Sequence, residues 1–328
     1  MTDIGVLLPT RGVVLKNPKR PDADVVLGMA QAAEEAGLDS VWVGDSLLAK
    51  PRLEPVTTLA AVAACTQRVR IGTAVLLAGL RQPVTLAHAL ATVDIISGGR
   101  LTVAVGVGGT FDAGQVSEWR AVGVSPRERA GRLEEMVEVM RALWTRNEVS
   151  FSGRHFQLDK VTLEPKPLQA GGIPVLLACH YRTGKERQYQ RAARLGDGFI
   201  SISDSPEEFA QVRQKVQECA RECGRPPEAM RAVYYMTVNI NDDASVAKRE
   251  GLAFVTQYYG RDFWGDRWGP YSTPNAVASR MKEYVAAGAD TLIVRFASLD
   301  PMAQLQRFVG KVLPQVKDAR PRFKGETA

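Results

Sequence analysis

The sequence has few of the residues that build metal centres and nucleophilic triads. It holds 4 cysteines and 3 histidines in 328 residues. No two cysteines form the C-x₂-C pair of structural zinc sites, and no H-E-x-x-H, G-x-S-x-G, P-loop or paired-carboxylate signature is present. We therefore predict no metal site and assign the difficult chemistry to an organic cofactor. The cysteines are interpreted as reduced thiols of a cytoplasmic protein: Cys65, Cys179, Cys219 and Cys223.

Long apolar runs and long runs of one charge are also missing. No apolar stretch reaches the roughly 20 residues of a membrane span, and residues 1–12 lack the charged region of a signal peptide, so we expect a first strand there and a cytoplasmic location. The net charge is +6, but the basic residues do not gather in a nucleic-acid-binding module. We therefore expect a small-molecule substrate rather than a membrane or nucleic-acid partner.

What the sequence does contain is a strict alternation of short apolar segments and longer helical patterns. Strands are expected at 4–8, 40–43, 70–77, 101–107, 175–179, 198–202, 232–239 and 291–296. Helices are expected at 24–36, 56–66, 83–96, 126–145, 183–195, 206–223, 244–258 and 301–313. Alternation predicts a parallel α/β sheet, and eight units predict closure into a (β/α)₈ TIM barrel formed by 1–328 as a single domain. A miscounted strand would instead favour an open, Rossmann-like sheet.

Two segments interrupt the alternation. Residues 146–172 alternate polar and apolar side chains around Gly153, which predicts an inserted hairpin before strand five. Residues 259–274 form a loop rich in glycine and aromatic residues before strand eight, and long loops of compact domains are usually functional. We interpret this loop as a lid over the substrate, with packing against the barrel or a partner as the alternative. Its candidate lid residues are Phe263, Trp264 and Trp268.

The active site of a barrel lies at the carboxyl ends of its strands. That rule selects Arg11 after the first strand as a substrate or lid contact, and Arg295 at the last strand. Asp45 follows the second strand and is the candidate catalytic acid–base group; a helix cap or a structural salt bridge is the alternative. The glycines after strand four fail the G-x-G-x-x-G pattern because Phe111 stands at the last position, but they permit a close approach of backbone to a flat ring.

The turn after strand five is a candidate phosphate site. A helix that starts there would point free N–H groups at an anion, and Arg182 or Lys185 could add a charge-assisted contact. In the alternative interpretation Thr183 only caps the helix. The predicted cofactor contacts in this turn are His180, Tyr181, Arg182, Thr183 and Gly184.

Several blocks of the chain resemble the bacterial luciferase-like oxidoreductases. The strongest is 70–108, and 32–45 (AAEEAGLDSVWVGD), 151–178 and 277–296 are similar to the corresponding parts of that superfamily. The resemblance implies an eight-stranded barrel, commonly a homodimer, that binds reduced FMN or the deazaflavin F420. It also implies a non-prolyl cis peptide behind the ring, at Ala74 and Val75, with Gly106 and Val107 near the ring and the cofactor phosphate at 180–184.

The chain also departs from the family pattern. Many members carry a histidine after the strand-two acid, where this chain has Ser46. The sugar-phosphate dehydrogenase branch has an acid after the strand-four glycines, where Gly109 and Thr110 stand here, so that branch is disfavoured. The main prediction is an FMN-dependent monooxygenase that activates O₂. The alternatives are F420-dependent hydride transfer and a non-catalytic flavin-binding barrel.

Overall fold

Eight parallel strands close into a barrel in this computed structural model, which describes residues 2–262, 265–267 and 269–317. The strands pair in chain order, and the last pairs with the first, Ile4 of β1 lying opposite Leu292 of β11. The predicted (β/α)₈ barrel is therefore confirmed. Its strands are β1 (Asp3–Leu7), β2 (Ser40–Val43), β3 (Arg70–Leu76), β4 (Leu101–Val105), β7 (Val175–Ala178), β8 (Gly198–Ile202), β9 (Arg231–Ile240) and β11 (Thr291–Phe296).

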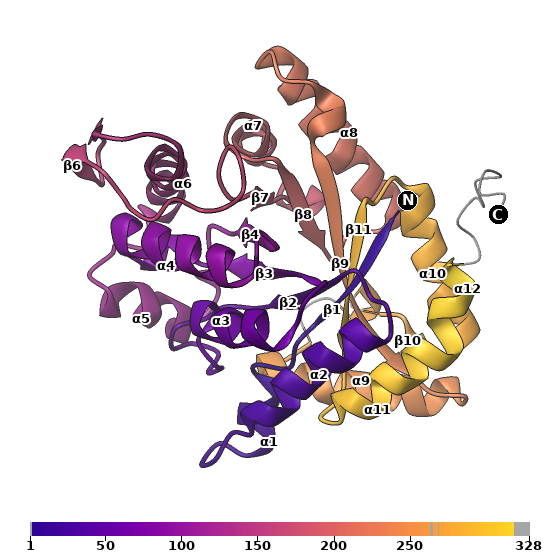
Figure 1. Cartoon of the computed structure of the whole chain (residues 1–328). Coiled ribbons are helices and arrows are strands. Elements are labelled where there is room, and N and C mark those ends of the chain that lie inside the picture. Colours follow the sequence, from indigo (N-terminus) through magenta and orange to yellow (C-terminus); the bar gives the residue numbers. More distant parts are fainter. Residues whose placement is uncertain (1, 263–264, 268, 318–328) are drawn as a thin grey trace, which may run out of the picture.

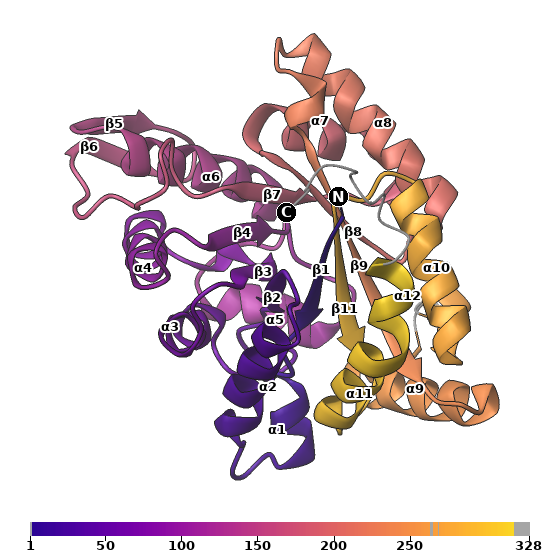
Figure 2. The same ribbon diagram turned by 45° about the vertical axis from the view of Figure 1, so that its right-hand side comes forward.

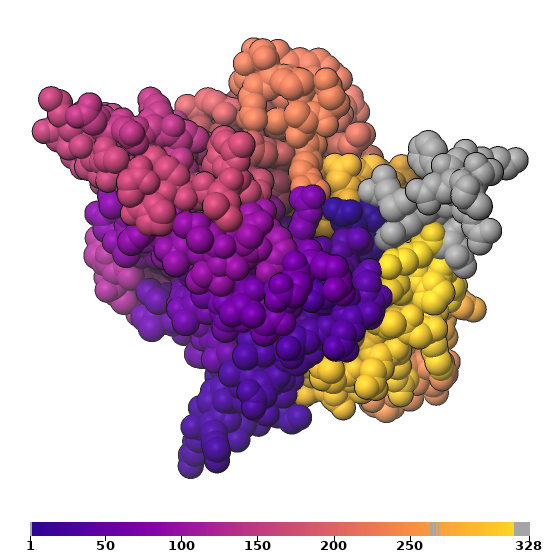
Figure 3. Space-filling model, in the orientation of Figure 1, coloured from indigo at the N-terminus to yellow at the C-terminus, as the bar shows by residue number. Residues whose placement is uncertain are grey.

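Helices surround the barrel on its outer face (Figure 1). Proline occupies the first turn of five of them, where its missing N–H needs no partner: α3 (Pro55–Cys65), α4 (Pro83–Ile96), α8 (Pro206–Glu222), α10 (Pro274–Ala286) and α11 (Pro301–Arg307). The others that follow strands or extend the layer are α2 (Ala23–Glu35), α6 (Arg129–Thr145), α7 (Glu186–Leu195), α9 (Ala244–Tyr259) and α12 (Leu313–Lys317). The N-terminal part of the chain, in indigo, and helices α11 and α12, in yellow, lie side by side on the face shown in Figure 3, where α11 contacts α2.

Most predicted helix bounds agree with the structure, and two starts are wrong. The helix predicted from 126 begins at Arg129. The helix predicted from 183 begins at Glu186, because Gly184 adopts a left-handed conformation (φ 60°) and residues 181–183 form a separate 3₁₀ turn. The helix predicted at 301–313 is split by a π-helical turn, Phe308–Val312. Three helices lie outside the predicted ranges: the short α1 (Gly12–Lys16) and α5 (Ala113–Ala121), and the longer α10, which follows the predicted loop 259–274.

The core has two layers because the strands are buried on both faces, as parallel strands usually are. Between strands and helices lies the larger layer, which includes Val6, Val41 and Val103. Inside the barrel lies a smaller one, built from Leu7, Trp42, Ala74, Ala104, Leu176, Ile200, Val233, Tyr235 and Ile293. This inner layer fills the interior of the barrel. Its side chains at the carboxyl ends of the strands form the floor of the cavity described below.

The inserted hairpin is confirmed as the antiparallel pair β5 (Val149–Ser152) and β6 (Gln157–Val161), which projects from the barrel wall (Figure 2). In the predicted loop 259–274, a two-residue strand β10 (Tyr271–Ser272) pairs with β9. Phe263, Trp264 and Trp268 lie outside the described residues, so their part in a lid stays a prediction. No helix in the described part of the chain has the length and apolarity needed to cross a bilayer.

Candidate active site at the barrel mouth

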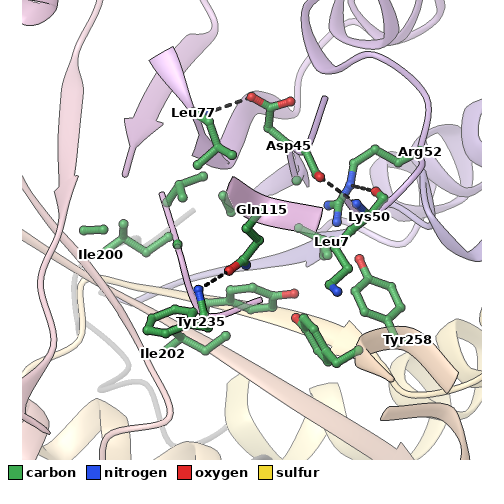
Figure 4. A pocket seen from close by; sticks show the side chains of 18 of the residues that line it. Leu7, Asp45, Lys50, Arg52, Leu77, Gln115, Ile200, Ile202, Tyr235 and Tyr258 are labelled. Carbon is green, nitrogen blue, oxygen red and sulfur yellow. Dashed lines mark hydrogen bonds between the residues drawn. The ribbon is translucent and has the colours of Figure 1, made fainter. Parts of the chain in front are cut away.

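A cavity of about 400 Å³ opens at the carboxyl ends of the strands (Figure 4). Small-molecule sites have volumes of roughly 300–1,000 Å³ and are mostly apolar with a few placed polar groups. Apolar side chains line one part of this cavity: Leu7, Ala74, Val75, Leu77, Phe111, Ala178, Ile200 and Ile202. Polar and aromatic side chains line the rest, among them Asp45, Ser46, Lys50, Arg52, Asp112, Gln115, Glu118, His180, Tyr235, Tyr258, Tyr259 and Arg261.

The cavity floor contains the bulge predicted at the end of strand three. The peptide bond between Ala74 and Val75 is cis, and the register against β4 shifts between Thr73 and Leu76. Gly106 lies behind this bulge, where a Cβ would come within 2.8 Å of the Val75 side chain. Ala74 and Val75 therefore line the cavity as expected, whereas Gly106 supports them and does not reach the lining, and neither does Val107.

Asp45 lines the cavity, but its carboxylate is already engaged. Its Oδ2 accepts hydrogen bonds from the Leu77 N–H at 2.8 Å and from Arg81 at 2.6 Å, and its Oδ1 accepts from Arg81 at 3.2 Å. The side chain is 1% exposed. This geometry is that of a bidentate structural salt bridge, which ties the end of β2 to the turn after β3. A catalytic role for Asp45 stays a prediction.

Ser46 is also held within the wall. Its hydroxyl donates to Glu118 of α5 at 2.9 Å, and the same Glu118 oxygen accepts from the Leu48 N–H at 2.7 Å. Sequence reasoning missed Glu118, since α5 was not predicted. The neighbouring Gln115 fills the space beside Gly109, where an added Cβ would come within 2.7 Å of its amide. The space beside Gly109 is thus filled by an amide rather than by a carboxylate.

His180 lines the cavity, whereas the rest of its turn lies farther out. Burial lowers the pKa of His180 to about 4, so its ring is neutral at pH 7. Gln188 fixes the turn by accepting from the His180 N–H and donating to the His180 carbonyl. Thr183 is not the cap of α7, and the first turn of that helix carries Glu186, whose charge opposes an anion. Tyr181, Arg182, Thr183 and Gly184 do not line the cavity, and all of them but Tyr181 are exposed.

A cluster of arginines and tyrosines forms another part of the cavity wall. The guanidinium carbons of Arg11, Arg52 and Arg295 lie 5.0, 5.9 and 4.9 Å from the centre of the Tyr258 ring. Arg11 does not line the cavity as predicted, because it is buried behind Tyr258 and donates to the carbonyls of Tyr258 and Pro51. Arg295 donates to the Tyr259 hydroxyl at 2.7 Å. The arrangement surrounds two phenols at the cavity with positive charge.

Comparison with known proteins assigns the chain to a family. The model of the luciferase-like monooxygenases matches residues 2–265. The chain belongs to this family. Its fold, its barrel-mouth cavity and the cis peptide near the end of β3 accord with the resemblance seen in the sequence, and membership makes it a luciferase-like oxidoreductase.

Two relatives of this luciferase-like protein are similar to it over nearly its whole length. The F420-dependent glucose-6-phosphate dehydrogenase of Amycolatopsis mediterranei is 30% identical over 88% of this chain and 93% of its own. The enzyme of the same name from Nocardia farcinica is 28% identical over 89% and 94%.

Among solved structures, the monooxygenase RslO1 from Streptomyces bottropensis superposes with a TM-score of 0.80 at 24% identity, covering 95% of this chain and 99% of its own. An F420-dependent secondary alcohol dehydrogenase superposes with a TM-score of 0.78 at 23% identity, covering 96% and 99%. These two likenesses are of fold.

Proposed function

We propose that this luciferase-like protein is an F420-dependent oxidoreductase that transfers a hydride between the deazaflavin and a small alcohol or carbonyl substrate. The observation that carries the proposal is the similarity, over almost 90% of the chain, to dehydrogenases that use F420. The 24% identity to a monooxygenase is a likeness of fold and does not favour oxygen chemistry. The predicted FMN-dependent monooxygenase therefore becomes the second candidate, and a non-catalytic barrel the third.

The residues at the barrel mouth fit a flat ring system. Ala74 and Val75 present a rigid apolar surface, and Leu7, Ala178 and Ile200 extend it. Neutral His180 can hydrogen-bond a ring edge without adding charge. When bound, F420 supplies the carbon that accepts or donates the hydride. The protein's own contribution is to hold donor and acceptor carbons in contact and to keep water out.

For the substrate we propose only a chemical class. The cavity is small and mostly apolar, with phenols and guanidinium groups on one wall. This suits a hydroxyl or carbonyl compound more than a large apolar chain. The expectation that sugar phosphates are disfavoured, based on Gly109 and Thr110, stays a prediction, and glucose 6-phosphate is one of its probes.

Anaerobic turnover distinguishes the three candidates. The purified protein is mixed with F420 and either propan-2-ol or glucose 6-phosphate, and the visible absorbance of the oxidised cofactor is followed with and without O₂. Hydride transfer predicts substrate-dependent bleaching that does not need O₂. Turnover only with reduced FMN and with O₂ consumption would favour the monooxygenase, and absence of binding to either cofactor would favour the non-catalytic barrel.

Replacing Arg182 with alanine is expected to weaken cofactor binding about 3- to 10-fold, the order of one exposed charge-assisted contact of about 1 kcal/mol. Arg182 is exposed in the turn that follows the cavity-lining His180, and we propose a phosphate or carboxylate on the cofactor tail as its partner. Fluorescence titration of F420 measures the change. Arg221→Ala, an exposed arginine near the end of α8, is the control. Equal affinities in all three proteins would remove Arg182 from the site.

The homodimer that the family resemblance implies is likewise a proposal. Sedimentation equilibrium of the purified protein should give the mass of two chains, and the mass of one chain would contradict it. A cytoplasmic location and a single domain formed by 1–328 stay predictions.

A further inference from the structure

The carboxylates that line the cavity are all committed to structural partners. Asp45 is paired with Arg81 and the Leu77 N–H. Glu118 accepts from Ser46, Leu48 and Ala49. Asp112 caps α5 by accepting from the Gln115 N–H and pairs with Lys50 at 3.3 Å. Asp45 and Glu118 could not exchange a proton with a substrate without breaking the wall of the site, and Asp112, whose side chain is 35% exposed, is held by its cap and by its pairing with Lys50.

His180 is a poor proton acceptor at neutral pH. Burial holds the pKa of its ring near 4, and the efficiency of a general base is greatest when its pKa is near the working pH. The chemistry proposed above nevertheless needs an acid–base group, because oxidation of an alcohol to a carbonyl releases the hydroxyl proton.

Tyr258 occupies the remaining wall of the cavity. It lies in the last turn of α9 and is 5% exposed, and it is drawn on the side of the cavity that holds Lys50 and Arg52, across from Ile200 (Figure 4). Arg295 and Arg11 approach its ring to 4.9 and 5.0 Å, and Arg52 to 5.9 Å. Three guanidinium groups from three separate segments therefore converge on one phenol.

We propose that Tyr258 is the catalytic acid–base residue of this enzyme, exchanging a proton with the hydroxyl or carbonyl oxygen of the substrate. This inference rests on the proposed hydride-transfer function. Proton exchange is thereby assigned to a tyrosine. Ser46 and Gly109 carry no ionisable side chain at the two positions where the family pattern has a histidine or an acid.

The electrostatics of the wall single out this phenol. Burial acts to raise the pKa of Tyr258, but the charges of Arg52, Arg295 and Arg11 outweigh burial and hold it below its ordinary value. The pKa values of Tyr235 and Tyr259 are raised, mainly by burial. The charged and titratable groups that face Tyr258 come from every neighbouring segment: Arg11 after β1, Lys50 and Arg52 after β2, Tyr235 on β9, Tyr259 and Arg261 at the end of α9, Arg295 on β11, and Asp112 paired with Lys50.

With F420 as the hydride acceptor, every proton and electron of the alcohol oxidation is accounted for. In the oxidation direction, the substrate O–H bond breaks and its proton bonds to the phenolate oxygen of Tyr258. The hydrogen on the adjacent carbon would leave with both electrons of its C–H bond, bound F420 would supply the acceptor carbon, and a C=O bond would form. The neutral phenol then returns its proton to solvent. In the reduction direction the phenol of Tyr258 donates the proton to the substrate oxygen, and bound F420 in its reduced form would supply the hydride.

The first test needs no cofactor. Ultraviolet absorbance of tyrosinate is followed while the apoprotein is titrated to high pH. The chain has 8 tyrosines, and we expect one of them to ionise below the ordinary pKa of about 10. Tyr258→Phe should remove that transition. Tyr189→Phe, which removes a buried phenol of α7 outside the cavity lining, should retain it. An early transition that persists in Tyr258→Phe would overturn the proposal.

The second test is the pH profile of F420 turnover with propan-2-ol and glucose 6-phosphate. Because the phenolate is the active base, kcat/KM for oxidation should rise with pH through the pKa of Tyr258. Tyr258→Phe should lower kcat/KM about 10²- to 10⁴-fold, the usual contribution of general acid–base catalysis, and abolish this rise, with F420 affinity unchanged. Tyr189→Phe should retain the wild-type profile.

The outcomes separate the two proposals. An active Tyr258→Phe variant with the wild-type pH profile would overturn the role of Tyr258 and leave hydride transfer standing. A wild-type protein that binds F420 but turns over neither probe would overturn the alcohol–carbonyl function, and the acid–base role with it.

Discussion

Replacing Ala178 with tryptophan is expected to weaken F420 binding about 100-fold or more. Ala178 ends β7 and lines the apolar part of the cavity beside the Ala74–Val75 bulge. An indole at this position would occupy the space proposed for the deazaflavin ring. Excluding roughly 120 Å² of ring surface from apolar contact costs about 3 kcal/mol at about 25 cal/mol per Å², which corresponds to about a 100-fold loss of affinity. Fluorescence titration of F420 measures it.

Ala178→Ser is the matched control, since it changes polarity at the same position with little added volume. We expect it to retain affinity to within a few fold. Thermal unfolding of both variants shows whether the barrel is intact. If a folded Ala178→Trp protein bound F420 as tightly as the wild type, the ring would have to lie elsewhere, and the assignment of the apolar floor as the ring site would be wrong.

Replacing Asp45 with alanine is expected to lower the free energy of unfolding by about 3–5 kcal/mol. Removal of one partner from a buried ion pair typically costs this much, and the Arg81 guanidinium would keep only its pairing with the partly exposed Glu54. Here the abandoned groups would be the Arg81 guanidinium and the Leu77 N–H. Urea denaturation of the apoprotein measures the change, because the effect does not depend on any cofactor.

Glu54→Gln is the control, because it removes a charge from the second partner of the Arg81 guanidinium. Glu54 also pairs with Arg81, at 3.0 Å, but its side chain is 42% exposed, so we expect a loss below about 1 kcal/mol. The comparison also tests the catalytic role predicted for Asp45. If Asp45→Asn were as stable as the wild type but inactive in turnover, Asp45 would be the acid–base group and the structural interpretation would fail.

The strand order could be predicted from the sequence because buried parallel strands have a distinctive pattern. Each is a short apolar run, as in LTVAV of β4, followed by a helix of nearly regular spacing. Helix starts were less predictable. Gly184 interrupts the pattern before α7 by adopting a left-handed conformation, a backbone choice that periodicity does not encode.

From the sequence, the lining of the cavity could be predicted only for residues at the ends of strands. Ala74, Val75 and His180 lie at strand ends, so the barrel rule and the family resemblance place them at the mouth. Glu118 lies on a helix within a glycine-rich segment whose periodicity is weak, and nothing local marks its bond to Ser46. The cluster of arginines around Tyr258 could not be predicted either, because these arginines come from segments up to about 280 residues apart and meet only after the barrel closes.

The most direct test of the account is an equilibrium titration of one preparation of the purified protein with F420 and, separately, with FMN in its oxidised and reduced forms. We expect F420 to bind at least about tenfold more tightly than either form of FMN, a difference of about 1.4 kcal/mol, and Ala178→Trp to weaken binding of F420 about 100-fold. Tighter binding of FMN than of F420, with O₂ uptake by the reduced complex, would contradict the account.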